Sequence, residues 1–194
     1  MSSHVIDKFC KRNKGIVTRK QLTKRRMYAQ LLKKVHNGDL VRLKAGVFAQ
    51  AEALASPIVD IRKIVPGGIL CLYSAWSYYE LTTQIPSSIC VAIKRGRKVV
   101  LPNFPDISLY RFTDSILKLG ITKARIGGLT LPIYDLERSV CDALRYRNKI
   151  GIETSSEIIR NYLSRKDRDL VKLHLYAKSL RVNNLLSTYL EIAI

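Results

Sequence analysis

The chain has 194 residues, of which 47% are hydrophobic and 25% charged, and its 34 Lys and Arg against 15 Asp and Glu give a net charge of +19. This balance is typical of a globular protein with one or two cores and excludes a disordered chain. The longest apolar stretch, residues 67–79, is too short to span a bilayer, and basic residues stand where a signal peptide would have its apolar core. We therefore expect a cytoplasmic protein with no membrane partner.

The positive charge is concentrated in the N-terminal quarter. Residues 1–49 contain 13 Lys and Arg but only two acids, Asp7 and Asp39, so they hold +11 of the total. A merely soluble basic surface would spread its charge evenly along the chain. The concentration instead predicts that this segment binds a nucleic acid.

Short helices dominate the predicted N-terminal elements. A first helix opens at Ser3, and residues 15–17 break it with a short extended link. Its predicted apolar side consists of Val5, Ile6, Phe9 and Cys10. Thr18-Arg19-Lys20-Gln21 has the form of a capping box at the start of a second helix. A third helix is predicted over about residues 28–37, ended by Gly38 as a left-handed cap.

Two short strands follow, residues 40–43 and 47–49, around a tight turn at 44–46. Three helices and a hairpin in this order predict a winged helix-turn-helix DNA-binding domain over residues 1–50. Residues 50–65 read as a linker running into a helix, so the second predicted domain is 51–194.

The second domain reads as a mixed α/β region followed by helices, which makes the whole chain α+β. Its predicted elements are a helix over 74–81, strands over 89–93, 107–112, 123–126 and 129–133, and a helix from Asp135 to Arg147. Gly127-Gly128 between two of the strands is a hairpin signal. Amphipathic helices are predicted over about 155–163, 167–179 and 182–192, which makes residues 152–194 a helical C-terminal segment.

In helix-turn-helix proteins the second motif helix enters the major groove while the wing lies along the backbone or minor groove. Because Leu31, Leu32 and Val35 should face the core, the third helix turns its polar residues outward. Arg and Gln suit base edges, while Lys suits phosphates. The predicted DNA contacts are Thr18, Arg19, Lys20, Arg25, Arg26, Tyr28, Gln30, Lys33, Lys34, Asn37, Arg42 and Lys44.

Other clusters are weaker candidates for sites. Lys94, Arg95, Arg97 and Lys98 form a basic turn that is either a second anion contact or simply solvated. Trp76, Tyr78 and Tyr79 could stack on bases, although core packing is the better interpretation. Asp135, Glu137 and Asp142 lie on one helix, where a helix cap and pairing with Arg138 or Arg145 explain them more simply than acid catalysis.

Enzyme signatures are missing from the sequence. It has no Gly-rich phosphate loop, no His-Glu-x-x-His and no Gly-x-Ser-x-Gly. Pro105-Asp106 is not followed by the acid-x-Lys triplet of a restriction-type nuclease. The four cysteines and three histidines are scattered, which argues against disulfides and a zinc site. We therefore expect no enzyme activity, no cofactor and no metal.

Several segments together resemble the AbiEi antitoxin family, the predicted transcriptional regulators of viral defence systems. The resemblance is carried by GIVTRKQL at 15–22, NGDLVRLKAGVFA at 37–49, VPGGILCLYSA at 65–75, QIPSSICVAI at 84–93 and IYDLERSVCDALRYR at 133–147. It covers nearly the whole chain, and the last motif is the most specific. Where the family often has Gly-Ile-Ser/Thr-type residues between the motif helices, this chain has Lys24-Arg25-Arg26-Met27.

The resemblance implies a repressor that binds double-stranded DNA at the operator of its own operon. It also implies the antitoxin of a type IV toxin-antitoxin system in phage defence, which counteracts a nucleotidyltransferase-type toxin without needing a stable complex. Two alternatives remain open. One is a stand-alone transcriptional regulator whose second domain senses a ligand or dimerises, and the other is a nucleic-acid-processing enzyme.

Overall fold

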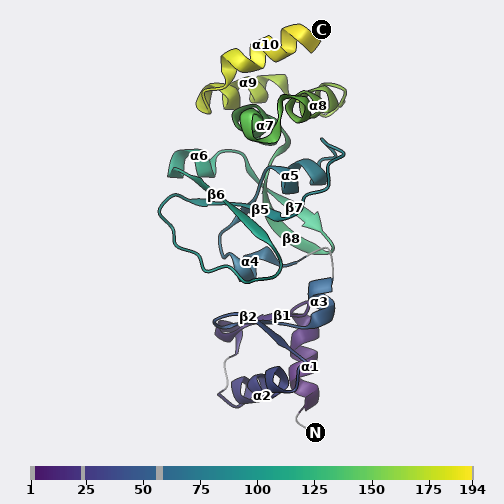
Figure 1. The fold of residues 1–194 in the computed structure, drawn as a ribbon, viewed down its shortest axis with the longest axis vertical. Helices are drawn as coiled ribbons and strands as arrows, with labels where there is room; N and C mark the ends of the chain where they lie inside the picture. Colours follow the sequence, from purple (N-terminus) through teal and green to yellow (C-terminus); the bar gives the residue numbers. More distant parts are fainter. Residues whose placement is uncertain (1–2, 23–24, 56–58, 194) are drawn as a thin grey trace. The chain divides into compact units, whose positions relative to one another are not determined.

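The structure, a computed structural model, describes residues 3–22, 25–55 and 59–193, and the side chains of Ser3, His4, Arg25, Ala55, Ile192 and Ala193 are not described. The chain forms two compact units (Figure 1). The first comprises residues 1–67, 98–107 and 126–129, and the second comprises the remainder. Both contain helices and a sheet, which confirms the predicted α+β class.

The first unit combines short helices with a small antiparallel sheet. Its elements are α1 (Ser3–Arg12), β1 (Ile16–Thr18), a 3-10 turn η1 (Arg19–Gln21), α2 (Arg25–His36), β2 (Val41–Lys44), β3 (Val47–Ala49), α3 (Ala51–Ala55) and α4 (Ile61–Ile64). The three strands are ordered β1-β3-β2, with Val17 and Arg42 both opposite Phe48. The hairpin turn depends on Gly46, whose φ of 74° lies in the left-handed region.

The core of this unit lies between α1, α2 and the sheet. Its fully buried members are Ile6, Cys10, Val17, Leu31, Leu40 and Phe48. The apolar side predicted for the first helix is therefore confirmed at Ile6 and Cys10, whereas Val5 is 55% exposed. Gly38 adopts the predicted left-handed conformation just after α2, with a φ of 82°.

The predicted second helix is wrong within the described residues, which contain only the 3-10 turn η1. The Thr18 N–H donates to Gln21 Oε1 at 2.8 Å, as one half of a capping box would. Leu22 is the only apolar residue between 18 and 24, so a longer helix would have no stripe to bury. A helix-turn-helix is accordingly not evident here, and residues 23–24 lie outside the described residues.

The helix predicted from residue 28 begins at Arg25 instead. Met27 and Tyr28 are partly buried against the core cluster, so burial of its first turn holds the longer helix in place.

The segment predicted as a linker belongs to the first unit. Ile61, Ile64 and Val65 are completely buried, and α3 and α4 lie within this segment. The Lys63 ammonium donates to the carbonyls of Asn13 and Ile16 at 2.7 and 2.6 Å. The unit therefore continues to residue 67, beyond the predicted boundary at 50, and residues 56–58 lie outside the described residues.

The second unit is a mixed sheet with helices. Its elements are β4 (Ile69–Leu70), α5 (Tyr73–Tyr78), β5 (Ile89–Lys94), β6 (Ile107–Phe112), α6 (Asp114–Lys118), β7 (Ile121–Ile126), β8 (Leu129–Tyr134), α7 (Leu136–Ile150), α8 (Ile152–Leu163), α9 (Leu170–Ser179) and α10 (Asn183–Ala193). The strand order is β6-β5-β4-β8-β7, and β4 runs antiparallel to β5 but parallel to β8. Helices α7 to α10 form the predicted C-terminal helical segment (Figure 1).

Local signals in this unit are confirmed. Gly127 and Gly128 both have positive φ, 52° and 70°, and connect β7 to β8 as a two-residue hairpin turn. The Asp135 carboxylate accepts from the Arg138 N–H at 2.9 Å and caps α7. The helix ends at Ile150 instead of Arg147, just before Gly151, whose φ is 92°.

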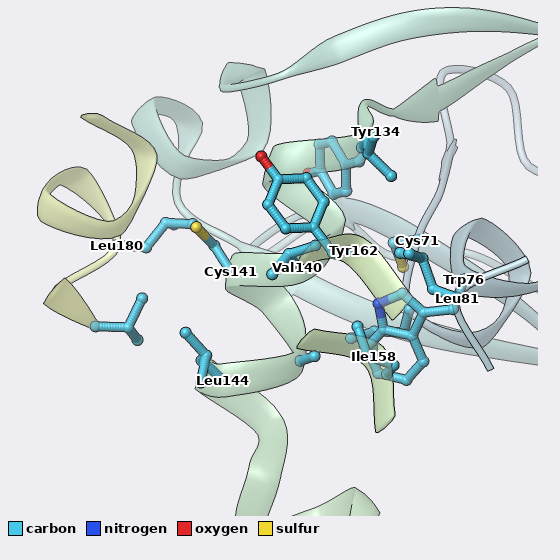
Figure 2. Close-up of a cluster of buried hydrophobic side chains, with 14 of the residues drawn as sticks. Cys71, Trp76, Leu81, Tyr134, Val140, Cys141, Leu144, Ile158, Tyr162 and Leu180 are labelled. Atoms are coloured by element: carbon cyan, nitrogen blue, oxygen red, sulfur yellow. The ribbon is translucent and has the colours of Figure 1, made fainter. Parts of the chain in front are cut away.

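The core of the second unit surrounds α7. Trp76 of α5 is completely buried and donates its indole N–H to the Ser139 carbonyl of α7 at 2.8 Å. Figure 2 shows its ring beside Leu81 and Ile158, with Val140, Cys141 and Leu144 along α7. The preference for core packing over base stacking is therefore confirmed for Trp76.

We expect Trp76→Phe to lower the free energy of unfolding by about 2–3 kcal/mol, because it leaves a gap and removes the buried indole hydrogen bond to the Ser139 carbonyl. Urea denaturation followed by circular dichroism measures the loss. Tyr78→Phe is the control, since Tyr78 lies on the same helix but is 41% exposed, and it should change stability by less than about 0.5 kcal/mol. Equal losses in the two variants would contradict this account of Trp76.

Candidate nucleic-acid interface

One face of α2 forms a groove with a basic lining. The groove has a volume of about 430 Å³ and is lined by Ile6, Arg26, Ala29, Gln30, Lys33, Lys34, Asn37 and Asp39. Positions 26, 30, 33 and 37 follow each other at helical spacing, so they share one face. Five residues predicted from the sequence to contact DNA thus lie together: Arg26, Gln30, Lys33, Lys34 and Asn37.

The opposite face of α2 explains why this one is turned outward. Leu31 is completely buried, and Met27, Tyr28 and Val35 pack against the same cluster. Leu32, predicted to face the core, is instead 43% exposed. Helical spacing leaves 26, 30, 33 and 37 away from the core, as predicted from the sequence.

Two neighbouring lysines on α2 have different environments. Lys33 is exposed. The Lys34 ammonium lies 2.7 Å from Asp7 and 3.5 Å from Asp39, and its side chain is only 15% exposed. The hydrogen bond to Asp7 raises the pKa of Lys34 above its usual range, despite partial burial. The charge of Lys34 is therefore largely compensated within the unit, which the sequence did not indicate.

The residues around the start of α2 form a second group. The Arg19 guanidinium lies 5.1 Å from the centre of the Tyr28 ring, and that ring packs edge-on against Phe48. Tyr28 is thus held between a cation and the core. Lys20 is exposed in η1, Thr18 is half-buried at the end of β1, and the side chain of Arg25 lies outside the described residues.

The β2–β3 hairpin presents Arg42 differently from Lys44. Arg42 is exposed on β2. The Lys44 ammonium donates to the carbonyls of Ile64 and Val100 at 2.6 and 3.1 Å. It therefore holds two distant segments of the first unit against the hairpin, and any effect of Lys44 on DNA binding would be partly indirect.

The basic turn at 94–98 follows β5. Lys94 pairs with Asp114 at 2.5 Å, which compensates its charge, whereas Arg95 and Lys98 are exposed and Arg97 is half-buried. Lys98 belongs to the first unit, two residues before the carbonyl that Lys44 contacts. The turn therefore contains exposed cations, and one of them lies in the unit that carries the α2 groove.

The acidic residues of α7 have structural partners. Asp135 caps the helix, Glu137 pairs with Lys172 at 3.0 Å, and Asp142 pairs with Arg138 at 3.1 Å. Burial raises the pKa of Asp142 to about 6, with Arg138 opposing that shift, so the carboxylate is ionised at neutral pH. The predicted helix cap at Asp135 and the predicted pairing of Asp142 with Arg138 are confirmed, whereas Glu137 pairs with Lys172 of α9.

Among residues 3–22, 25–55 and 59–193, no group of three His, Cys, Asp or Glu side chains could hold a metal ion. No helix of this part of the chain is both long and apolar enough to cross a bilayer. Comparison with known proteins found neither a family model nor a curated protein that matches the chain.

Proposed function

We propose that the first unit binds double-stranded DNA as a winged helix, with α2 as recognition helix and the β2–β3 hairpin as wing. The observation that carries the proposal is the basic groove on the outward face of α2, which is lined by Arg26, Gln30 and Asn37, residue types that bind base edges. Lys33 and Arg42 are exposed, and in this proposal they would contact the phosphate backbone.

The order of elements supports this proposal. A winged-helix domain has a helix, a strand, two further helices and a hairpin, and α1, β1, η1, α2, β2 and β3 follow this order with η1 in the place of the middle helix. The first strand lies beside the last, in the sheet order β1-β3-β2. The first motif helix would then be reduced to η1. Arg19 N–H donates to the Gly46 carbonyl at 2.8 Å, so η1 is tied to the tip of the proposed wing.

The pairing of charges gives independent support. The only two acids of residues 1–49, Asp7 and Asp39, both lie against Lys34. The other cations of this segment therefore create a field that its own acids compensate little, as a phosphate backbone requires. Within the first unit, the exposed Lys98 would add to this field.

We further propose that the protein is a transcriptional repressor and the antitoxin of a type IV system, acting against a nucleotidyltransferase-type toxin. The support is the resemblance of residues 15–22, 37–49, 65–75, 84–93 and 133–147 to the AbiEi family. A reporter under the promoter of its own operon should be repressed by the protein. Co-expression should rescue growth from the product of an adjacent nucleotidyltransferase gene, and failure of rescue with intact repression would leave a stand-alone regulator.

Base readout on α2 is tested with alanine variants. Arg26→Ala and Gln30→Ala should each weaken binding to the cognate operator by about 1–3 kcal/mol and relax sequence preference, because they would remove base-edge hydrogen bonds. Binding to operator and to scrambled duplex, measured by fluorescence anisotropy, separates the two effects. Lys33→Ala is the control, since loss of a phosphate contact should weaken both duplexes alike. Equal losses on both duplexes for Arg26 and Gln30 would show that other residues read the bases.

A further inference from the structure

We propose that the outer face of α9 is a docking surface for an acidic, amphipathic segment of a partner protein. This surface, the α9 stripe, consists of Arg168, Val171, Leu175 and Lys178. Val171, Leu175 and Lys178 are four and three residues apart, so they lie along one side of the helix, and Arg168 precedes the first helical residue by two positions. The proposal does not depend on DNA binding by the first unit.

The aliphatic residues of the stripe are exposed to an unusual degree for one short helix. Val171 is 74% exposed and Leu175 is 59% exposed, and adjacent Leu170 is 42% exposed. The opposite side of α9 is occupied, because Leu173 and Ala177 are buried in the core. Single exposed aliphatic residues are common, but two large ones a turn apart form a contiguous apolar strip.

A hollow extends the stripe at the start of α9. It measures about 700 Å³ and is lined by Lys166, Arg168, Asp169, Leu170 and Val171. The hollow is broad and open to solvent, so a partner side chain that packs on Val171 would rest against it without being enclosed.

The charges around the stripe are predominantly positive. Lys166, Arg168 and Lys178 are exposed, and in the described part of the chain no carboxylate oxygen lies within 4 Å of their side-chain nitrogens. Of the two nearby acids, only Asp167 has a cationic partner among the described residues, so the exposed Asp169 keeps its negative charge beside Leu170 and Val171. Asp167 forms two hydrogen bonds with Arg165, at 2.8 and 2.9 Å, and Asp169 accepts from the Lys172 N–H at the helix start.

This combination selects the class of partner. A second copy of the chain, with net charge +19, would bring like charges together at the rim. Nucleic acid would pair with the cations but would leave Val171 and Leu175 without apolar contacts, since bases stack mainly on aromatic residues and Arg. An acidic, amphipathic segment would match both the apolar residues and the cations of this surface. Its apolar side chains would pack on Val171 and Leu175, and its carboxylates would pair with the cations at the ends of the stripe.

The test measures binding of a fluorescein-labelled peptide to the full chain by anisotropy, near 0.15 M salt, where purely electrostatic contacts are screened beyond about 8 Å. The peptide has about 18 residues, with Leu at positions i, i+3, i+4 and i+7 and Glu at most others, so that it forms an acidic amphipathic helix. A scrambled peptide of the same composition is the ligand control. The protein variants are Val171→Ser/Leu175→Ser and Lys166→Glu/Lys178→Glu.

Both double variants should bind the amphipathic peptide about tenfold more weakly than the wild type, or worse, and the scrambled peptide should bind weakly to all three proteins. Ile152→Ser is the matched control, since Ile152 is 66% exposed on α8 outside the stripe, and it should bind like the wild type. The charge variant keeps the test valid if the apolar variant folds poorly.

Three results would overturn the proposal. The first is no saturable binding of the amphipathic peptide by the wild type, and the second is equal binding of the scrambled peptide. The third is a loss of affinity for duplex DNA in the Val171→Ser/Leu175→Ser variant, which would assign the surface to nucleic acid.

Discussion

The affinity of the protein for duplex DNA is expected to fall about a thousandfold when the salt concentration is raised from about 50 to 200 mM. Each phosphate neutralised by Lys or Arg releases condensed counterions, so the logarithm of affinity falls linearly with the logarithm of salt concentration, with a slope of about −0.9 per phosphate. The exposed cations Arg26, Lys33 and Arg42, with others on the same unit, would supply about six such contacts. Anisotropy titrations at four salt concentrations give the slope.

The adjacent lysines on α2 provide a matched pair for this experiment. Lys33→Ala should reduce the slope by about one, because an exposed ammonium is lost. Lys34→Ala, which would have an equal effect if both lysines met phosphates, should change the slope less, because Asp7 and Asp39 already compensate Lys34. A flat response of the wild type to salt would contradict the assignment of this face to DNA, and equal slope changes would show that Lys34 leaves Asp7 on binding.

The largest loss of stability is expected from Asp142→Ala, about 3–5 kcal/mol at neutral pH. Arg138 and Asp142 are both completely buried, and the Arg138 Nε lies 3.1 Å from Asp142 Oδ1. Removing the carboxylate would leave the guanidinium charge buried without a counterion. The remaining guanidinium contacts, to the Ile116 and Leu119 carbonyls at 2.6 and 3.1 Å, are to neutral groups. Urea denaturation followed by circular dichroism measures the change.

The control for this variant replaces both partners. Arg138→Met/Asp142→Leu removes both charges, so it should destabilise the fold less than Asp142→Ala, although the two carbonyls lose their donor. A loss below about 1 kcal/mol for Asp142→Ala would mean that Arg138 finds another counterion or reaches water. A double variant less stable than the single one would show that the pair itself stabilises the core.

Much of the second unit could be predicted from the sequence because its signals are local. Asp135 caps α7 through an N–H three residues away, and Gly127-Gly128 connects two strands through its own backbone conformation. Such signals depend on neighbours a few residues apart and persist in whatever fold surrounds them. The outward face of α2 was also predictable, since the spacing of Leu31 and Val35 determines which side is buried.

Amino-acid order alone determined the α+β class, the concentration of positive charge in residues 1–49 and the group of residues on the exposed face of α2. Only the tertiary structure decided which cations on that unit are available. Lys34 pairs with Asp7, and Lys44 donates to the carbonyls of Ile64 and Val100, which are far from it in the sequence. It also decided that residues 51–67 belong to the first unit and that the second predicted helix is a single turn. The physical reason is that the partner of a long, flexible side chain depends on which distant segments converge on it, and no local pattern records that convergence.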